Sequence, residues 1–285
     1  MVERPTTALV LAGGGSLGAV QVGMLRELFA AGERFDFIVG ASAGAINGAY
    51  FAANPTSAGI AALENIWRAI TRWDVMPLSI TTLLNVMLRR DYIVDGSALR
   101  RLLHRHLGDG TIETASLPLH IVATDLLSGD EVVLSHGPVV QAVLASAAIP
   151  GIFPPVPVGQ RLLIDGGVAN NAPISAAVAR GAARILVLPT GFACVPKSLR
   201  PGAAARAMHA VNLLVSRQLV NDIERFADRA QIIVVPTLCP LEASSYDYSV
   251  CAGLIDRAAD CTRAWIEQGG LAITGAPPML HEHSH

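Results

Sequence analysis

The sequence has few charged residues and a single lysine. Only 15% of its 285 residues are charged, Lys197 is its one lysine, and the formal net charge is −2. A chain so weakly charged has no overall electrostatic attraction for nucleic acid or for an anionic membrane. We therefore expect no nucleic-acid partner.

Long hydrophobic runs are lacking as well. No stretch reaches the roughly 18 apolar residues that suggest a membrane-spanning helix. The apolar residues 6–12 are followed by three glycines and by no cleavage-site pattern, so we interpret them as a first strand and not as a signal peptide. We expect a cytoplasmic protein with peripheral contact at the inner face of the membrane.

Cysteine is scarce, and its spacing fits no metal site. The four cysteines form no C-x-x-C pair and have no histidines at zinc-ligand spacing. We expect structural thiols in a reducing compartment, and neither a metal nor a cofactor.

Apolar residues, in contrast, are abundant, at 52% of the chain. An apolar run at residues 7–12, a helical pattern at 17–31, a second apolar run at 35–39 and a small-residue helix through Ala53 follow one another. Such alternation of strands and helices is typical of a parallel sheet that is covered by helices. The pattern predicts a three-layer α/β/α fold with a mostly parallel central sheet.

The rest of the chain continues this alternation. We predict a mostly helical region at 57–107, strands at 119–124, 131–134, 162–164, 184–188 and 231–235, and helices at 139–148, 173–180, 203–228 and 250–268. Residues 7–180 are expected to form a core that carries all the motifs. Residues 181–269 would complete the same domain, and residues 270–285 would form a tail.

The sequence GASAG at residues 40–44 matches G-x-S-x-G, with Ser42 at its centre. A nucleophilic serine needs a sharp strand-to-helix turn, and small residues such as Gly40 and Gly44 allow the backbone to make it. An apolar strand precedes the motif and an alanine-rich helix follows it. The context favours a nucleophile, although a purely structural turn would give the same pattern.

A nucleophilic serine also needs a proton acceptor, for which histidine is the usual residue. The ordinary α/β-hydrolase places its serine turn after several strands, whereas here one strand precedes the turn strand. That difference argues against a Ser–His arrangement. The histidines considered as partners are His104, His106, His120, His136 and His209.

Asp165 is the strongest carboxylate candidate. It ends a short apolar strand, where the sites of parallel sheets gather, and Gly166 and Gly167 follow it. A carboxylate at hydrogen-bond distance can accept the proton of a serine. Asp125 and Asp130 are weaker candidates because aspartate beside a hairpin turn is ordinary turn chemistry.

A third motif, GGGSLG at residues 13–18, lies between the first strand and its helix. Its unpaired N–H groups could stabilise an oxyanion or bind a phosphate. Gly13, Gly15 and Gly18 also match the G-x-G-x-x-G pattern of dinucleotide-binding domains. That function requires an acidic residue at the end of the second strand, where this chain has Ser42. The nucleotide hypothesis is therefore the weaker alternative.

These three motifs, in this order, resemble the patatin-like phospholipase family. ASAAIPGIFPPV at residues 145–156 and NNAP at 170–173 are similar to that family too. The resemblance implies a Ser42–Asp165 dyad and hydrolysis of acyl esters in phospholipids, lysophospholipids or neutral lipids. It also implies an oxyanion hole and a set of supporting glycines: Gly13, Gly14 and Gly15, with Gly14 and Gly15 as main donors, and Gly18, Gly40, Gly44, Gly166 and Gly167.

The chain departs from the family pattern at Leu17, where many members have arginine or lysine. The missing cation weakens the expectation of phospholipase A activity more than that of esterase activity. Two alternatives stay open: a transacylase that uses the same acyl-enzyme, and a non-catalytic nucleotide-binding or scaffold domain.

An apolar segment at residues 76–88 is followed directly by Arg89 and Arg90. An apolar helix with a basic flank can lie on a lipid surface. It can equally pack as a helical cap on the core, with its arginines in water.

Overall fold

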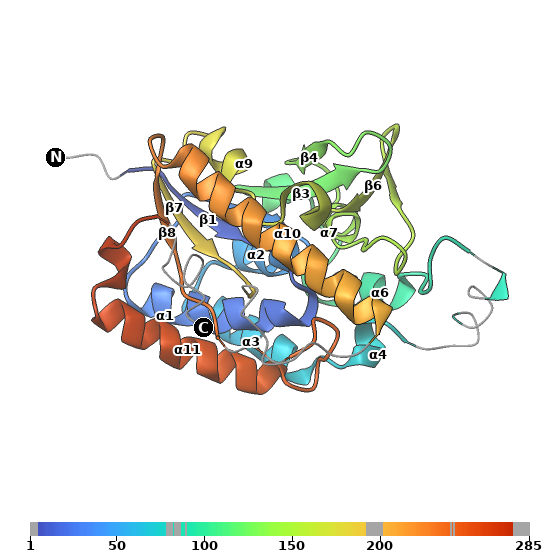
Figure 1. Cartoon of the computed structure of the whole chain (residues 1–285), viewed down its shortest axis with the longest axis horizontal. Coiled ribbons are helices and arrows are strands. Elements are labelled where there is room, and N and C mark those ends of the chain that lie inside the picture. The colour runs from blue at the N-terminus through green and yellow to red at the C-terminus, as the bar shows by residue number, and fades with distance from the viewer. Residues whose placement is uncertain are drawn as a thin grey trace.

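A computed structural model describes residues 5–77, 82, 87–88, 90–191, 202–239, 241 and 243–275. Its centre is an eight-stranded sheet of order β5-β6-β3-β2-β1-β7-β8, with β4 paired to β3 (Figure 1). The strands are β1 Thr7–Leu11, β2 Phe37–Ala41, β3 Leu119–Asp125, β4 Glu131–Leu134, β5 Val156–Val158, β6 Arg161–Asp165, β7 Arg184–Leu188 and β8 Gln231–Val234.

The sheet is mostly parallel. β3, β2, β1, β7 and β8 are neighbours that run in the same direction, whereas β4, β5 and β6 are antiparallel to their partners. All five residues of β1 and of β2 are buried, because both faces of these central strands are covered. Their unbroken apolar runs are the sequence signature of that burial.

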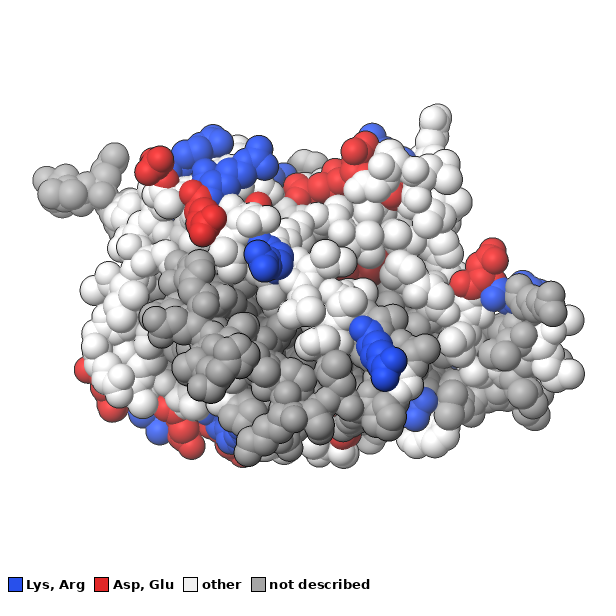
Figure 2. Space-filling model, viewed as in Figure 1, with Lys and Arg blue, Asp and Glu red and all other residues white. Residues whose placement is uncertain are grey.

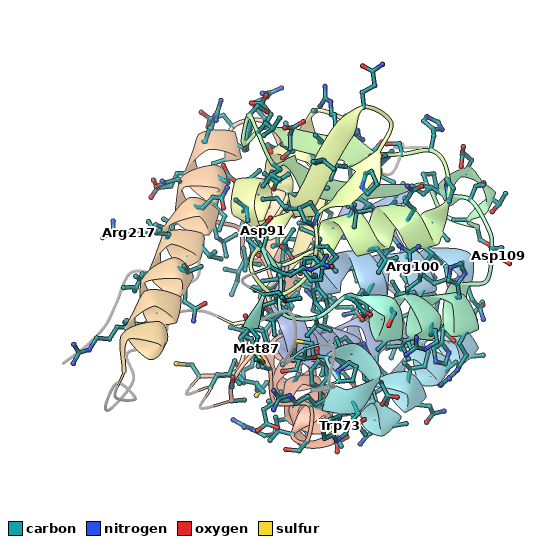
Figure 3. The ribbon with its side chains drawn as sticks, turned by 90° about the vertical axis from the view of Figure 1, so that its right-hand side faces the viewer. Trp73, Met87, Asp91, Arg100, Asp109 and Arg217 are labelled. Carbon is teal, nitrogen blue, oxygen red and sulfur yellow. The ribbon has the colours of Figure 1, made fainter. Side chains whose placement is uncertain are left out.

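Helices cover both faces of the sheet, and the predicted three-layer α/β/α fold is confirmed. Leu9 and Leu11 of β1 pack into one core with α1 Ala19–Ala30, α2 Ala43–Ala53, α3 Ser57–Ala69, α6 Ser97–Leu107, α7 Val139–Ser146 and α11 Cys251–Glu267. Ala8 and Val10 face the other side, toward α9 Ile174–Val178 and α10 Ala203–Phe226. Figure 3 shows α10 along one side of the molecule, with Arg217 pointing away from the body.

Several elements differ from the sequence prediction. β2 begins at Phe37. The preceding residue, Asp36, is bonded to the start of β1 through its side chain, since its carboxylate accepts the Thr7 N–H at 2.7 Å. Residues Gly15–Gly18 form a 3₁₀ turn, η1, before α1. β5, in the proline-dense loop, was not predicted; Pro157 is tolerated there because β5 is an edge strand.

Short helices follow α3 and β6, and the last described residues bond to the sheet. α4 Arg72–Val75 follows α3, and α8 Gly167–Asn170, which was not predicted, follows β6 directly. The first residues of the predicted tail are ordered against the sheet, since Gly275 N–H donates to the Ile232 carbonyl oxygen at 2.9 Å. Residues 276–285 lie outside the described residues.

The thiol prediction is wrong at one position. Cys251 and Cys261 are free, but Cys239 is disulfide-bonded. Cys194 lies outside the described residues. Spacing along the chain does not reveal which thiols a fold brings together, so this bond could not be predicted from the positions of the cysteines.

Charged side chains are sparse on the surface, as the composition requires. On the face drawn in Figure 2, most of them gather near the upper and lower borders, and the described surface between is largely uncharged. Within the described residues, no helix has both the length and the apolar character needed to cross a membrane.

Candidate active site

Ser42 lies at the turn between β2 and α2. Its φ of 52° and ψ of −120° make it the one non-glycine residue with a positive φ in the described part of the chain. Such strained backbone is typical of a nucleophile turn. The turn also requires glycine nearby, because a Cβ on Gly44 would lie 2.1 Å from the Leu11 carbonyl oxygen. The G-x-S-x-G motif and the backbone conformation therefore both indicate a nucleophile turn at Ser42.

Asp165 is the last residue of β6, and the fold brings it to Ser42. The Ser42 hydroxyl donates a hydrogen bond to Asp165 Oδ2 at 2.6 Å, although 123 positions separate the two residues. The other carboxylate oxygen, Oδ1, accepts the Gly167 N–H at 2.8 Å. The serine hydroxyl thus points at a carboxylate that is held in place from its far side.

The surroundings make this carboxylate more basic than an ordinary aspartate. Burial raises the pKa of Asp165 to about 6, against the opposing hydrogen bonds from Ser42 and Gly167. The group is therefore mostly ionised at neutral pH and still a better proton acceptor than an exposed aspartate.

The glycine-rich loop is held from two sides. Gly13 N–H donates to the Asn171 carbonyl oxygen at 3.0 Å, and Ser16 N–H donates to the Ser245 carbonyl oxygen at 2.8 Å. The Ser16 hydroxyl donates to the carbonyl oxygen of Ser244 at 3.1 Å. Of the three predicted oxyanion donors, Gly13 is thus the one whose N–H is already used within the protein.

Gly14 and Gly15 have no hydrogen-bond partner for their N–H groups in the described part of the chain. Thr190, just beyond β7, supports this loop by donating its hydroxyl to the Gly13 carbonyl oxygen at 2.6 Å. The approach is so close that a Cβ on Gly14 would lie 2.1 Å from Thr190 Oγ1. The other supporting positions also require glycine, because a Cβ there would lie too close to neighbouring atoms. These positions are Gly18, Gly40, Gly166 and Gly167.

An apolar pocket adjoins Ser42. Its lining includes Ile46 of α2, Trp67 of α3, Leu102 of α6 and Phe153. The lining is predominantly hydrophobic, as in sites that bury most of an apolar ligand. Such a lining beside the serine hydroxyl suits a hydrocarbon chain better than a charged group.

His106 lies in the lining of the same pocket, on α6, and its ring contacts that of Tyr50 with 6.4 Å between centroids. Burial, aided by the charge of Arg105, lowers the pKa of His106, which favours its neutral form. Among the described hydrogen bonds of Ser42, none involves a histidine. His106 is therefore part of the pocket wall.

The other candidate partners lie elsewhere. His104 and His120 are hydrogen-bonded to other side chains, and His209 belongs to α10. Asp125 accepts the N–H groups of Leu127 and Ser128 at 3.0 and 3.1 Å, as expected of a turn residue. His104, His120 and Asp125 therefore have local structural roles.

Sequence reasoning missed residues that complete the site from other parts of the chain. The Thr124 hydroxyl donates to the Asp165 carbonyl oxygen at 2.8 Å. Tyr248, after β8, lines the pocket, and the pKa of Tyr246 is raised by burial and by the charge of Asp165. No local pattern marks these residues. Only the packing of the C-terminal segment against the glycine loop brings the two tyrosines to the site.

Comparison with known families gives a match over most of the core. Residues 9–178 match the family model described as patatin-like phospholipase. A Mycobacterium tuberculosis protein described as an uncharacterized NTE family protein is 31% identical over 209 residues, covering 70% of this chain and 34% of the relative. Patatin-like phospholipase domain-containing protein 6 of Mus musculus is 33% identical over 192 residues, covering 65% of this chain and 14% of the relative.

The chain thus spans about a third or less of the length of these curated relatives. Among solved structures, the complex of ExoU with SpcU from the type III secretion system of Pseudomonas aeruginosa is similar, with 21% identity and a TM-score of 0.48. That match covers 95% of this chain and 54% of the other. In the described residues, no group of three or more His, Cys, Asp or Glu side chains is arranged to hold a metal ion.

Proposed function

Because this chain belongs to the patatin-like phospholipase family, we propose that it hydrolyses acyl esters of lipids through Ser42 and Asp165. The observation that carries the proposal is the 2.6 Å hydrogen bond from the Ser42 hydroxyl to the Asp165 carboxylate. In the described part of the chain, the N–H groups of Gly14 and Gly15 have no hydrogen-bond partner, and both lie on the loop beside Ser42. Nucleophile, base and oxyanion donors are the three parts that acyl transfer requires.

The first half of the proposed reaction acylates the serine. Ser42 Oγ attacks the ester carbonyl carbon while its proton passes to Asp165. The carbonyl oxygen becomes an oxyanion, which the N–H groups of Gly14 and Gly15 stabilise as the charge develops. The intermediate then collapses, the C–O bond to the alcohol breaks, and the alcohol leaves with the proton from Asp165.

The second half releases the fatty acid. A water molecule gives its proton to Asp165 as it attacks the acyl-enzyme, and the same N–H groups stabilise the second oxyanion. The bond to Ser42 Oγ then breaks, and the serine takes back the proton from Asp165. One carboxylate thus acts as base and as acid in each half-reaction.

The pocket supports a hydrocarbon acyl chain as the substrate class. It adjoins Ser42 and is lined by aliphatic and aromatic side chains. We therefore propose phospholipids, lysophospholipids or neutral lipids as substrates. Leu17 of the glycine loop is buried in the core, so this position supplies no cation for a phosphate head group.

The test is turnover of p-nitrophenyl esters of increasing acyl length, and of phosphatidylcholine, lysophosphatidylcholine and triacylglycerol. Ser42→Ala and Asp165→Asn should each lower kcat by about 10⁴-fold, since members of such a catalytic unit act together. Asp125→Asn, which alters a carboxylate of a turn, is the matched control and should retain activity. A fluorophosphonate probe should label wild type and not Ser42→Ala.

Two further outcomes decide between mechanisms. If Ser42→Ala or Asp165→Asn turned over the substrate at the wild-type rate, the proposed dyad would be refuted. With an added alcohol, release of free fatty acid identifies a hydrolase, whereas formation of a new ester identifies a transacylase.

We also propose peripheral contact with a lipid surface. Most of the apolar segment predicted to make that contact, at positions 78–81 and 83–86, lies outside the described residues. Trp73 and Leu88, in the same part of the chain, are 62% and 66% exposed. Arg72 and Arg90 are exposed beside them in the sequence. Exposed apolar side chains next to arginine are typical of groups that bind an anionic interface.

Sedimentation with anionic vesicles tests this contact. Wild type should sediment with the vesicles, and a variant carrying Trp73→Glu and Leu88→Glu should stay in the supernatant. Equal sedimentation of the two proteins would contradict the proposed contact.

A further inference from the structure

Ser146, at the end of α7, is fully buried and contacts the backbone of the nucleophile. Its hydroxyl accepts the Ser42 N–H at 2.8 Å and donates to the Val122 carbonyl oxygen of β3 at 2.5 Å. The residue belongs to the stretch at 145–156 that resembles the family but has no role in the reaction as proposed above. Its neighbour Ala147 lines the apolar pocket, whereas Ser146 does not.

The bond to Ser42 lies at a strained point of the described backbone. The N–H of Ser42 belongs to the residue whose φ is 52°. Strained conformations persist only where surrounding contacts hold them, and a buried N–H without a partner is unfavourable. Because Ser42 is 6% exposed, water is a poor substitute for the hydroxyl of Ser146. This one side chain therefore supplies both a partner and a fixed direction for the nucleophile turn.

The same segment also bonds to the backbone at Asp165. The main-chain carbonyl oxygen of Ser146 accepts the Gly166 N–H at 3.0 Å, and that of Ala148 accepts the Asp165 N–H at 2.9 Å. Residues 146–148 thus bond to both members of the Ser42–Asp165 pair. The distance between hydroxyl and carboxylate depends on this bridge as well as on the sheet.

We propose that Ser146 is a positioning residue for the acyl transfer, acting through the backbone of Ser42. This inference rests on the proposed function. The Ser146 hydroxyl sets the orientation of the nucleophile turn, and that orientation keeps the Ser42 hydroxyl in line with Asp165. Ser146 itself touches no substrate, since it is buried behind the pocket wall.

The expected kinetic signature follows from that placement. Loss of the hydroxyl leaves the pocket lining intact, so KM for a long-chain p-nitrophenyl ester should stay near the wild-type value. The reacting atoms would be displaced, and a displacement of about 1 Å can lower turnover by about 100-fold. The effect should therefore appear in kcat, and in the rate at which a fluorophosphonate probe labels Ser42.

The experiment uses two matched pairs at position 146. Wild type and Ser146→Ala both have a small side chain at this position and differ only in the hydroxyl group. Ser146→Thr and Ser146→Val share an added methyl group and differ in that only the first retains a hydroxyl. Ile255→Val, a mild truncation of a fully buried side chain on α11, controls for loss of stability.

We expect kcat to fall about 100-fold in Ser146→Ala and in Ser146→Val, while KM stays unchanged. The kcat of Ser146→Thr should be well above that of Ser146→Val. If Ser146→Ala does not fold, the Thr and Val variants alone decide the outcome. Near wild-type kcat in Ser146→Ala or Ser146→Val, or an equal loss in Ile255→Val, would overturn it. Full turnover by Ser42→Ala would instead show that the proposed function itself had failed.

Discussion

Replacement of Asp165 by asparagine should abolish turnover and at the same time stabilise the fold. The carboxylate is buried at the end of β6, and its hydrogen-bond donors are the Ser42 hydroxyl and the Gly167 N–H. No cation forms an ion pair with it among the described residues. A buried charge without an opposite charge is costly, and asparagine removes that charge while keeping an oxygen acceptor.

The magnitude follows from the shift in pKa. Burial raises the pKa of Asp165 from 3.8 to about 6, a difference worth about 3 kcal/mol. The folded state binds this proton more tightly than the unfolded state, so the free energy of unfolding falls as the pH rises from about 4 to about 6. Above that range the ionised carboxylate costs the fold about 3 kcal/mol, whereas well below about pH 4 both states are protonated and this cost disappears.

Urea unfolding of wild type and Asp165→Asn, measured from about pH 4 to about pH 8, tests this reasoning. The variant should be more stable by up to about 3 kcal/mol at pH 8, and the difference should shrink toward pH 4. Asp125→Asn serves as a control of opposite sign, because backbone hydrogen bonds lower the pKa of Asp125. A difference that did not vary with pH, or a less stable Asp165→Asn at pH 8, would refute the argument.

Three other predictions concern activity. The kcat for a p-nitrophenyl ester should rise with pH through about 6, because Asp165 must be ionised to accept the serine proton; a flat profile across this range would exclude it as the base. Gly14→Ala should lower kcat by about 10²-fold or more, since the new Cβ meets Thr190 and displaces an oxyanion donor; unchanged kcat would remove Gly14 from the oxyanion hole. His106→Phe should retain turnover of short esters, and its inactivation in that assay would indicate a histidine base.

The sequence by itself indicated most of the strands and helices, the turn that carries Ser42, and Asp165 as the candidate proton acceptor. The apolar run of β1 and the helical pattern after it are local, so their burial on a covered sheet follows from composition and period alone. The Ser42 turn was equally local, because a strand, small residues and a helix within a dozen positions leave few alternatives. Asp165 was identified by its place at a strand end.

Only the tertiary structure decided how these pieces meet. The bond from Ser42 to Asp165 depends on β3 and β6 lying side by side, which no local pattern encodes. The same holds for the glycine loop. The carbonyl oxygens of Asn171 and Ser245 accept the N–H groups of Gly13 and Ser16. The N–H groups of Gly14 and Gly15 have no partner among the described residues.

The physical reason is that a hydrogen bond needs an arrangement of atoms within a few tenths of an ångström, whereas a sequence pattern constrains only the backbone of its own segment. Ser146 illustrates the difference. In the sequence it is one serine among small residues. In the fold its hydroxyl, 104 positions away from Ser42, holds the backbone on which the proposed chemistry depends.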